Sequence, residues 1–167
     1  MISIHENHVY PETVNLISEI KEWASYKQEK TNVDLRKAYA KVYSAHKYHR
    51  ETFQSYKEWI NSLNLGFGNV LNTAQIWGMV YDASDKTMPH QHPEFEYAGI
   101  HYLEADEGCG KLYINHEEII PKPNMIVVCH GWDFHWVMPA TNPNAKRVAM
   151  VFNFGEYNED KWIPPSN

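Results

Sequence analysis

The sequence is short of the residues and segments that mark several large classes of protein. It has only two cysteines, Cys109 and Cys129, and they form no CxxC pair, so a disulfide-based fold is not expected. No run of about 18 apolar residues occurs, and the first residues lack the charged and apolar regions of a secretion signal. The net charge of −6 comes without any basic stripe, which argues against nucleic acid as an obligatory partner. We therefore expect a cytoplasmic protein with no membrane segment.

The chain does have enough apolar material for one hydrophobic core. Of its 167 residues, 43% are hydrophobic, and a chain of this length favours a single domain. We expect one domain over residues 1–167. It would consist of a helical layer at 1–65, a β core at 66–157 and a polar tail at 158–167.

The first 65 residues have the apolar spacing that is typical of helices. Pro11 can occupy a first helical turn. Apolar residues then recur every three positions, which places them on one side of a helix. These residues are Val14, Ile17, Ile20 and Trp23. A second and longer helix is predicted to begin near Asp34, a good N-cap, and to continue to about Ile60.

After residues 66–68 the pattern changes to that of β-strands. Short runs rich in Val, Ile, Tyr, Trp and Phe are separated by Gly, Pro, Asn and Asp. The predicted fold class is therefore α+β and mainly β, with a helical layer followed by a barrel or sandwich. Six strands are predicted, near Ala74–Tyr81, Glu96–Leu103, Lys111–Ile114, Met125–Cys129, Phe134–Met138 and Arg147–Phe154.

The last predicted strand has two chemically different faces. One face is entirely apolar and suits packing under the helices, while the other carries one charge and one amide among small residues, as the wall of a cavity would. The apolar face consists of Val148, Met150, Phe152 and Phe154. The cavity face consists of Arg147, Ala149, Val151 and Asn153.

Three histidines form the candidate metal site. In an extended chain His90 and His92 point to the same side, so both imidazoles can reach one ion at about 2.0 to 2.1 Å. His135 lies at the start of a later strand, and an antiparallel barrel can bring it beside this pair. Three neutral histidines on one side of a metal leave the other positions open for substrate and oxygen.

Two further residues are predicted to bind a small ligand near the metal. Arg147 is on the cavity face of the last strand, and its guanidinium can bind a carboxylate through two parallel hydrogen bonds. The open alternative is a salt bridge to one of the chain's own carboxylates. Tyr102 has the same strand parity as the HxH pair if Pro93 introduces no bulge, so its hydroxyl can donate to the same ligand. Ordinary core packing is the open alternative for this side chain. His101 has the opposite parity and should face outward or into the helical layer, and His130 is expected in a loop.

The sequence leaves a carboxylate ligand open as an alternative to the third histidine. Iron sites of the two-histidine, one-carboxylate type need an acidic residue. Both Glu94 and Glu96 keep the parity of the histidines, so either could complete the site.

From Trp77 to Phe154 the sequence resembles small bacterial and phage-type 2-oxoglutarate/Fe(II)-dependent oxygenases, which are prolyl-hydroxylase-like members of the double-stranded β-helix superfamily. The order and spacing of the matching stretches resemble that family as well. These stretches are His90–Pro93, Ala98–Leu103, Gly110–Leu112, Trp132–Pro139 and Arg147–Phe154.

The resemblance implies a jelly-roll barrel with helices packed against one sheet, and an enzyme with Fe(II) held by the histidines. It implies that 2-oxoglutarate chelates the iron while Arg147 pairs with its distal carboxylate. With O2, such an enzyme converts 2-oxoglutarate to succinate and CO2 and commonly hydroxylates a second substrate. The sequence departs from the family at His92, because the family usually has His-x-Asp or His-x-Glu at that place.

Two other functions stay open. His90, His92, Glu96 and His135 also follow the ligand order of cupin-type metalloenzymes. A non-catalytic phage structural protein with an unused metal site is the other alternative, and a surface rich in aromatic residues would suit it. Such aromatic residues on helices outside a barrel also favour a homodimer.

Overall fold

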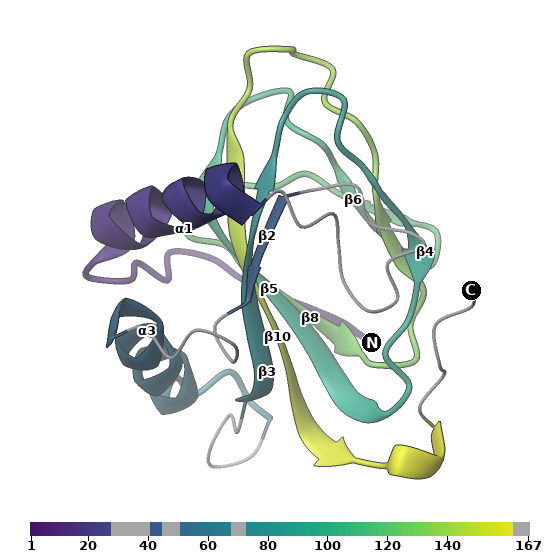
Figure 1. Ribbon diagram of the computed structural model, residues 1–167. Helices are drawn as coiled ribbons and strands as arrows, with labels where there is room; N and C mark the ends of the chain where they lie inside the picture. Colours follow the sequence, from purple (N-terminus) through teal and green to yellow (C-terminus); the bar gives the residue numbers. More distant parts are fainter. Residues whose placement is uncertain (28–40, 45–50, 68–72, 162–167) are drawn as a thin grey trace.

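The structure is a computed structural model that describes residues 1–27, 41–44, 51–67 and 73–161 (Figure 1). The helices are α1 (Thr13–Lys27) and α3 (Glu51–Ser62), followed near the end by the short 3-10 helix η2 (Glu159–Lys161). None of the helices in these ranges is long and apolar enough to cross a membrane. The strands are β1 (Ile2–His5), β2 (Lys41–Ser44), β3 (Thr73–Tyr81), β4 (Thr87–His90), β5 (Phe95–Ala105), β6 (Leu112–Ile114), β7 (Glu117–Ile119), β8 (Ile126–His130), β9 (His135–Val137) and β10 (Arg147–Tyr157).

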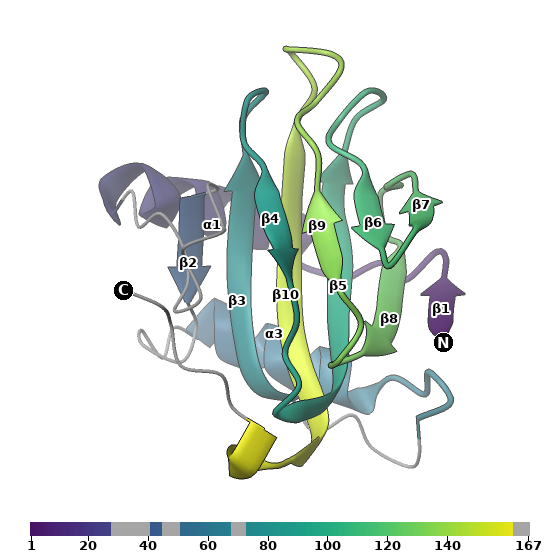
Figure 2. The ribbon, with the colours of Figure 1, turned by 90° about the vertical axis from the view of Figure 1, so that its right-hand side faces the viewer.

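The strands form two antiparallel sheets that face each other. The larger sheet has the order β1-β8-β5-β10-β3-β2, and the smaller has the order β4-β9-β6-β7. Figure 2 shows the four short strands lying in front of the larger sheet, and Figure 1 shows α1 and α3 on its opposite side. This arrangement confirms the predicted mainly-β jelly roll with helices packed on one sheet.

Strand β10 separates two apolar cores, as its alternation predicted. On one face Val148, Met150, Phe152 and Phe154 are buried in a cluster that includes Leu16 and Ile20 of α1 and Phe53 and Tyr56 of α3. On the other face Ala149 and Val151 belong to a second cluster between the two sheets. Because side chains alternate across a strand, one face of β10 contributes to the core under the helices and the other face to the core between the sheets.

A close approach of helix to sheet depends on one glycine. A Cβ atom at Gly78 of β3 would lie 2.9 Å from the Ile20 side chain of α1. Real Cβ contacts are essentially never that short, so a larger residue at this position would force the Ile20 side chain to shift.

The helical predictions were only partly right. In α1 the buried residues are Leu16, Ile20 and Ala24, while Val14 is 80% exposed, because the buried stripe follows a spacing of four rather than three. The predicted long helix is interrupted: Lys41–Ser44 form a strand that pairs with β3, and the second described helix begins at Glu51. Asp34, the predicted N-cap, lies outside the described residues.

The interpretation of the first 65 residues as purely helical is wrong for a second reason. Ile2–His5 form strand β1, which pairs with β8 at one edge of the larger sheet. Strands β4 and β7 were not predicted either. Segments of three or four residues are too short to show a period, and they are strands because a neighbouring strand offers hydrogen bonds.

His101 is buried between the larger sheet and the helices, which is one of the two positions expected for it. Its Nε2 lies 2.9 Å from the carbonyl oxygen of His8, which can only accept, so Nε2 donates there. Its Nδ1 then accepts a hydrogen bond from the Tyr56 hydroxyl at 2.9 Å. Burial lowers the pKa of His101 from 6.5 to about 4. The folded protein therefore holds this ring neutral, with both nitrogens in use.

Because of this histidine, the free energy of unfolding should decrease as the pH is lowered. Below pH 6.5 the unfolded chain takes up a proton at His101, whereas the folded chain does so only near pH 4, so acid favours unfolding in this window. The expected loss from His101 between pH 7 and pH 5 is about 2 kcal/mol. Urea unfolding of wild type and His101→Gln at both pH values measures it. An equal pH dependence in the two proteins would contradict this account.

Candidate metal centre

The structure brings the three predicted histidines together at one end of the smaller sheet. His90 ends β4 and His135 begins β9, and the two residues are directly paired in the sheet. One ligand atom from each of His90, His92 and His135 lies within 4.8 Å of the others. Two ligands at about 2.1 Å from one ion are at most about 4.2 Å apart, so small side-chain rotations suffice to bind a metal.

Hydrogen bonds to backbone carbonyls orient two of the three rings. His90 Nδ1 donates to the carbonyl of Met88 at 2.8 Å, and His135 Nδ1 donates to the carbonyl of Asp133 at 3.0 Å. The proton is therefore on Nδ1, which leaves Nε2 with its lone pair for a metal. His92 Nε2 is buried and has no hydrogen-bond partner within the described part of the chain. A buried polar atom without a partner is costly, and a metal ion at this point would remove that cost.

The environment keeps these histidines in the form that binds metals. Burial lowers the pKa of His92 well below its ordinary value, and the neighbouring His90 and His135 lower it further. Burial, with a smaller effect of His90, lowers the pKa of His135 to about 3. Because only neutral imidazole coordinates a metal, the donor set fits a divalent ion at neutral pH.

A small cavity lies between the two sheets beside the histidines. Its volume is about 60 Å³. The wall is mainly apolar, and it also includes Trp77, Tyr81 and Thr87. The Tyr81 hydroxyl lies 2.6 Å from Thr87 Oγ1 and 3.6 Å from the sulfur of Met79. An apolar wall of this kind limits the access of bulk water to the histidines.

Arg147 is buried in the barrel interior, near the far end of the cavity. Its Nε donates to the carbonyl of Gly110 at 3.2 Å, and its Nη2 lies 3.5 Å from the Tyr102 hydroxyl. The guanidinium carbon lies 4.0 Å from the centre of the Tyr81 ring, which is part of the cavity wall. Nη1 is buried without a partner, and no carboxylate of the described residues forms an ion pair with this arginine. The site therefore has a fixed buried cation with an unused donor, which suits an anionic ligand.

Tyr102 lies beside Arg147 in the apolar cluster between the two sheets. Burial, only partly opposed by the nearby guanidinium, raises the pKa of Tyr102 to about 12. Its hydroxyl therefore stays protonated at neutral pH and can donate a hydrogen bond to the same anion.

Comparison with known proteins identifies the fold, although no family model and no curated protein sequence matches the chain. A prolyl-4-hydroxylase from Pseudomonas putida superposes with a TM-score of 0.74 at 14% identity, over 94% of this chain and 93% of that one. The viral collagen prolyl hydroxylase of Paramecium Bursaria Chlorella virus-1, solved as a 2OG complex, gives 0.62 at 14% identity, over 91% and 94%. The chain has the prolyl-hydroxylase-like fold of the 2-oxoglutarate/Fe(II) oxygenases.

This oxygenase fold extends beyond prolyl hydroxylases. The non-heme alpha ketoglutarate dependent epimerase SnoN from nogalamycin biosynthesis superposes with a TM-score of 0.68 at 9% identity, over 99% of this chain and 88% of that one. At such low identities the similarity concerns the fold, and the chemistry must be argued from the residues of the site.

The structure does not bring Glu94 or Glu96 to the three histidines. The chain turns after His92, whose carbonyl accepts a hydrogen bond from the backbone of Phe95 at 3.0 Å, so Glu94 lies in a turn where strand parity does not apply. Glu96 instead accepts a hydrogen bond from the backbone of Glu156 at 3.3 Å. Both glutamates line a separate pocket at the barrel end.

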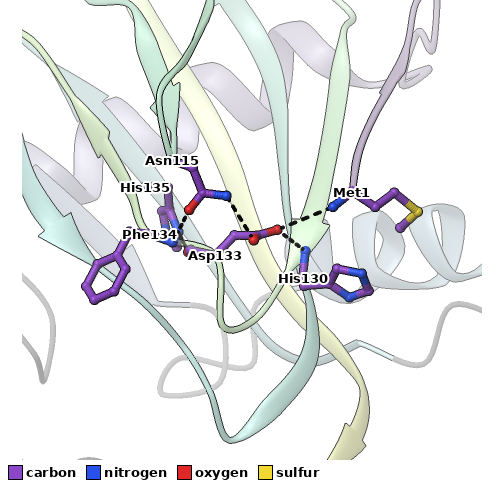
Figure 3. Close-up of polar contacts among 6 residues, drawn as sticks. All are labelled: Met1, Asn115, His130, Asp133, Phe134 and His135. Atoms are coloured by element: carbon purple, nitrogen blue, oxygen red, sulfur yellow. Dashed lines mark hydrogen bonds and ion pairs between the residues drawn. The ribbon is translucent and has the colours of Figure 1, made fainter.

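Asp133 and Asn115 hold the loop that leads to His135, and sequence analysis missed both (Figure 3). The Asp133 carboxylate accepts hydrogen bonds from the backbone of His130 at 3.0 Å and from Asn115 Nδ2 at 3.1 Å. Asn115 also pairs with the backbone of Phe134 in both directions, at 2.6 and 3.2 Å. Since the Asp133 carbonyl orients the His135 ring, this network positions the third histidine. The only signal in the sequence was an aspartate two residues before the histidine.

Replacing Asp133 by alanine should weaken metal binding without removing a ligand. Lost support for a metal-binding histidine typically costs about 10- to 100-fold in affinity. Calorimetric titration with Zn(II) measures the effect. The matched control is Asp106→Ala, because the Asp106 carboxylate also caps a loop, through the backbone of Lys146 at 3.0 Å, but its loop carries none of the three histidines. Equal Zn(II) affinities of the two variants would contradict a positioning role.

Proposed function

We propose that this protein is a 2-oxoglutarate- and Fe(II)-dependent oxygenase that hydroxylates a second substrate. In this proposal His90, His92 and His135 hold the iron, and Arg147 with Tyr102 binds the distal carboxylate of 2-oxoglutarate. The observation that carries it is a pair of unused buried atoms within one barrel: His92 Nε2 and Arg147 Nη1. His92 Nε2 suits a metal and Arg147 Nη1 suits an anion. A dicarboxylate that chelates the metal with one end could reach Arg147 with the other.

The spacing of these groups along the barrel suits such a ligand. From Arg147 to Val151 strand β10 rises about 13 Å. Val151 is paired with Trp77, whose ring centre lies 6.2 Å from that of His92. The extended side chains of Arg147 and His92 occupy part of that length, and a five-carbon dicarboxylate is of a size to bridge the remainder.

Each residue would have a defined task. Bound iron would supply redox chemistry with O2, while oxidative decarboxylation of 2-oxoglutarate to succinate and CO2 supplies the two further electrons for hydroxylation. Arg147 would neutralise the distal carboxylate, and Tyr102 would donate a hydrogen bond to it. The three neutral histidines would fix the metal at one end of the cavity, whose apolar wall would exclude water.

The third histidine gives this site a different charge from one with a carboxylate ligand. His92 is neutral, so the metal keeps its full charge of +2 before the cosubstrate binds. Bound 2-oxoglutarate would bring one carboxylate to the metal and the other to Arg147, so the metal centre would keep one net positive charge. We expect this extra positive charge to favour binding of the anionic cosubstrate.

Two observations favour this proposal over the alternatives. A cupin-type site would need Glu96 among the ligands, and Glu96 is bonded to the backbone of Glu156 instead. A structural protein with an unused site would not need ligand atoms of three histidines within 4.8 Å of one another, beside a cavity.

The direct test is succinate formation from 2-oxoglutarate. The purified protein should release succinate in air when Fe(II) and 2-oxoglutarate are both present, and release should stop when a chelator removes the metal. The Glu96→Gln variant is the matched control, because it should keep this activity in the proposed site and lose metal binding in a cupin-type site. Absence of 2-oxoglutarate binding to metal-loaded protein would overturn the proposal.

A further inference from the structure

Two buried polar atoms on the interior face of the larger sheet have no role in the proposed binding of metal and 2-oxoglutarate. They are Nε1 of Trp77 and Oδ1 of Asn153, and neither has a hydrogen-bond partner among the residues that the structure describes. Buried polar groups are nearly always hydrogen-bonded in folded proteins, and the exceptions call for an explanation. A ligand that bonds to both atoms would provide one.

Sheet register places these two side chains close together. Asn153 of β10 is paired with Gln75 of β3, and Val151 is paired with Trp77. Side chains two positions apart lie on the same face, so Trp77 and Asn153 are diagonal neighbours, about 7 to 8 Å apart or somewhat less. This is the face that Ala149 and Val151 turn toward the barrel interior.

The two atoms have opposite hydrogen-bonding character. The indole N–H of Trp77 can only donate. The Asn153 amide donates through Nδ2 to Gln75 Oε1 at 3.1 Å, and this bond leaves Oδ1 as an acceptor. The pair therefore offers one donor and one acceptor from diagonally neighbouring positions of the interior face.

The pair is on the side of the metal centre that the cosubstrate would leave open. Trp77 lines the metal cavity, and its ring centre lies 6.2 Å from that of His92. Arg147 lies six residues before Asn153 on β10, about 20 Å away along the strand. If 2-oxoglutarate lies between the metal and Arg147, as the proposed function has it, the second substrate approaches from the side of Trp77 and Asn153.

We propose that Trp77 and Asn153 bind the second substrate through a planar amide edge that carries a carbonyl oxygen and an N–H side by side. A lactam or a primary carboxamide has such an edge, whereas in a trans peptide bond the two groups point in opposite directions. The carbonyl accepts from Trp77 Nε1 and the N–H donates to Asn153 Oδ1. Ala98 and Val151 both line the cavity and are apolar, so they would contact the faces of the planar group.

The test uses the indole N–H signals of protein labelled with 15N-tryptophan, which nuclear magnetic resonance resolves individually. Zn(II)-loaded protein is titrated with 2-pyrrolidinone, with and without 2-oxoglutarate. The Trp77 signal, assigned through Trp77→Phe, should shift downfield in a saturable way. Trp136, which stacks on Tyr113 of the smaller sheet, and Trp59, which stacks on His101, serve as internal references and should not move.

The control ligand for 2-pyrrolidinone is N-methyl-2-pyrrolidinone, which keeps the carbonyl and lacks the N–H. It should bind at least about tenfold more weakly than 2-pyrrolidinone. Asn153→Leu should abolish that difference. Trp77→Phe keeps an aromatic side chain, and it should weaken both ligands when binding is followed on the ligand signals. Equal affinity of the two ligands for the wild type, or equal shifts of all indole signals, would overturn the inference.

This experiment fails independently of the proposed function. Selective lactam binding without succinate formation would support the amide subsite and contradict the oxygenase. Succinate formation without lactam selectivity would support the oxygenase and contradict the amide subsite.

Discussion

The Arg147→Met variant is expected to stay folded and to lose 2-oxoglutarate binding. Removing one member of a buried charge pair typically costs about 2 to 5 kcal/mol, so the affinity for 2-oxoglutarate should fall by at least about 30-fold. The free energy of unfolding in the absence of ligand should be unchanged or higher, because Nη1 of the arginine has no partner and methionine fills a similar volume. Calorimetric titration of Zn(II)-loaded protein and thermal unfolding measure the two quantities.

A loss of affinity without a loss of stability distinguishes a ligand-binding arginine from a structural one. A structural arginine would give a large loss of stability in Arg147→Met with unchanged affinity in whatever protein stays folded. Arg147→Lys is the companion variant. It keeps the charge but lacks the planar fork that contacts both Gly110 and Tyr102. Its affinity for 2-oxoglutarate should therefore lie between those of the wild type and Arg147→Met.

The His135→Ala variant should have the largest effect on metal binding. The loss of a direct ligand should reduce Zn(II) or Fe(II) affinity by more than the roughly 100-fold upper range for lost supporting hydrogen bonds. Without metal the variant should fold normally, and it should tolerate acid better than the wild type. Burial lowers the pKa of His135 to about 3, so in the window between about pH 6.5 and 3 this ring takes up a proton only on unfolding. Zn(II) titration and acid unfolding check both expectations.

His116→Ala is the control for this variant, because His116 is exposed and lies between β6 and β7 rather than in the cluster. Its Zn(II) affinity should equal that of the wild type. His92→Asp should retain metal binding, since a carboxylate is an established ligand at such a centre. Unaltered Zn(II) affinity in His135→Ala would show that the three histidines do not act as one site.

Several parts of this site could be predicted because side chains alternate between the two faces of a strand with a period of two residues. The two-residue period places His90 and His92 on one side without further information. The same period correctly divided β10 into a face under the helices and a face in the barrel, and this put Arg147 in the interior. For His101 it left two positions open, outward or toward the helices, and the structure has the second.

The errors arose where local pattern competes with partners distant in the chain. The spacing around Val42 resembles that of a helix, but Lys41–Ser44 form a strand because β3 offers an edge for pairing. Glu94 keeps the parity of the histidines in the sequence, yet a turn closed between His92 and Phe95 takes it away from them. Asp133 and Asn115 carry no motif, and they matter only because two loops meet.

The sequence by itself determined which residues could bind metal and anion, because residue type and strand parity are local properties. Only the tertiary structure decided that these residues form one site. His135 reaches the HxH pair through the pairing of β4 with β9, and β4 was not recognisable as a strand from its own residues. Likewise, the unpaired atoms of His92, Arg147, Trp77 and Asn153 become evident only after folding, because hydrogen-bond partners and exclusion of water depend on the packing of two sheets.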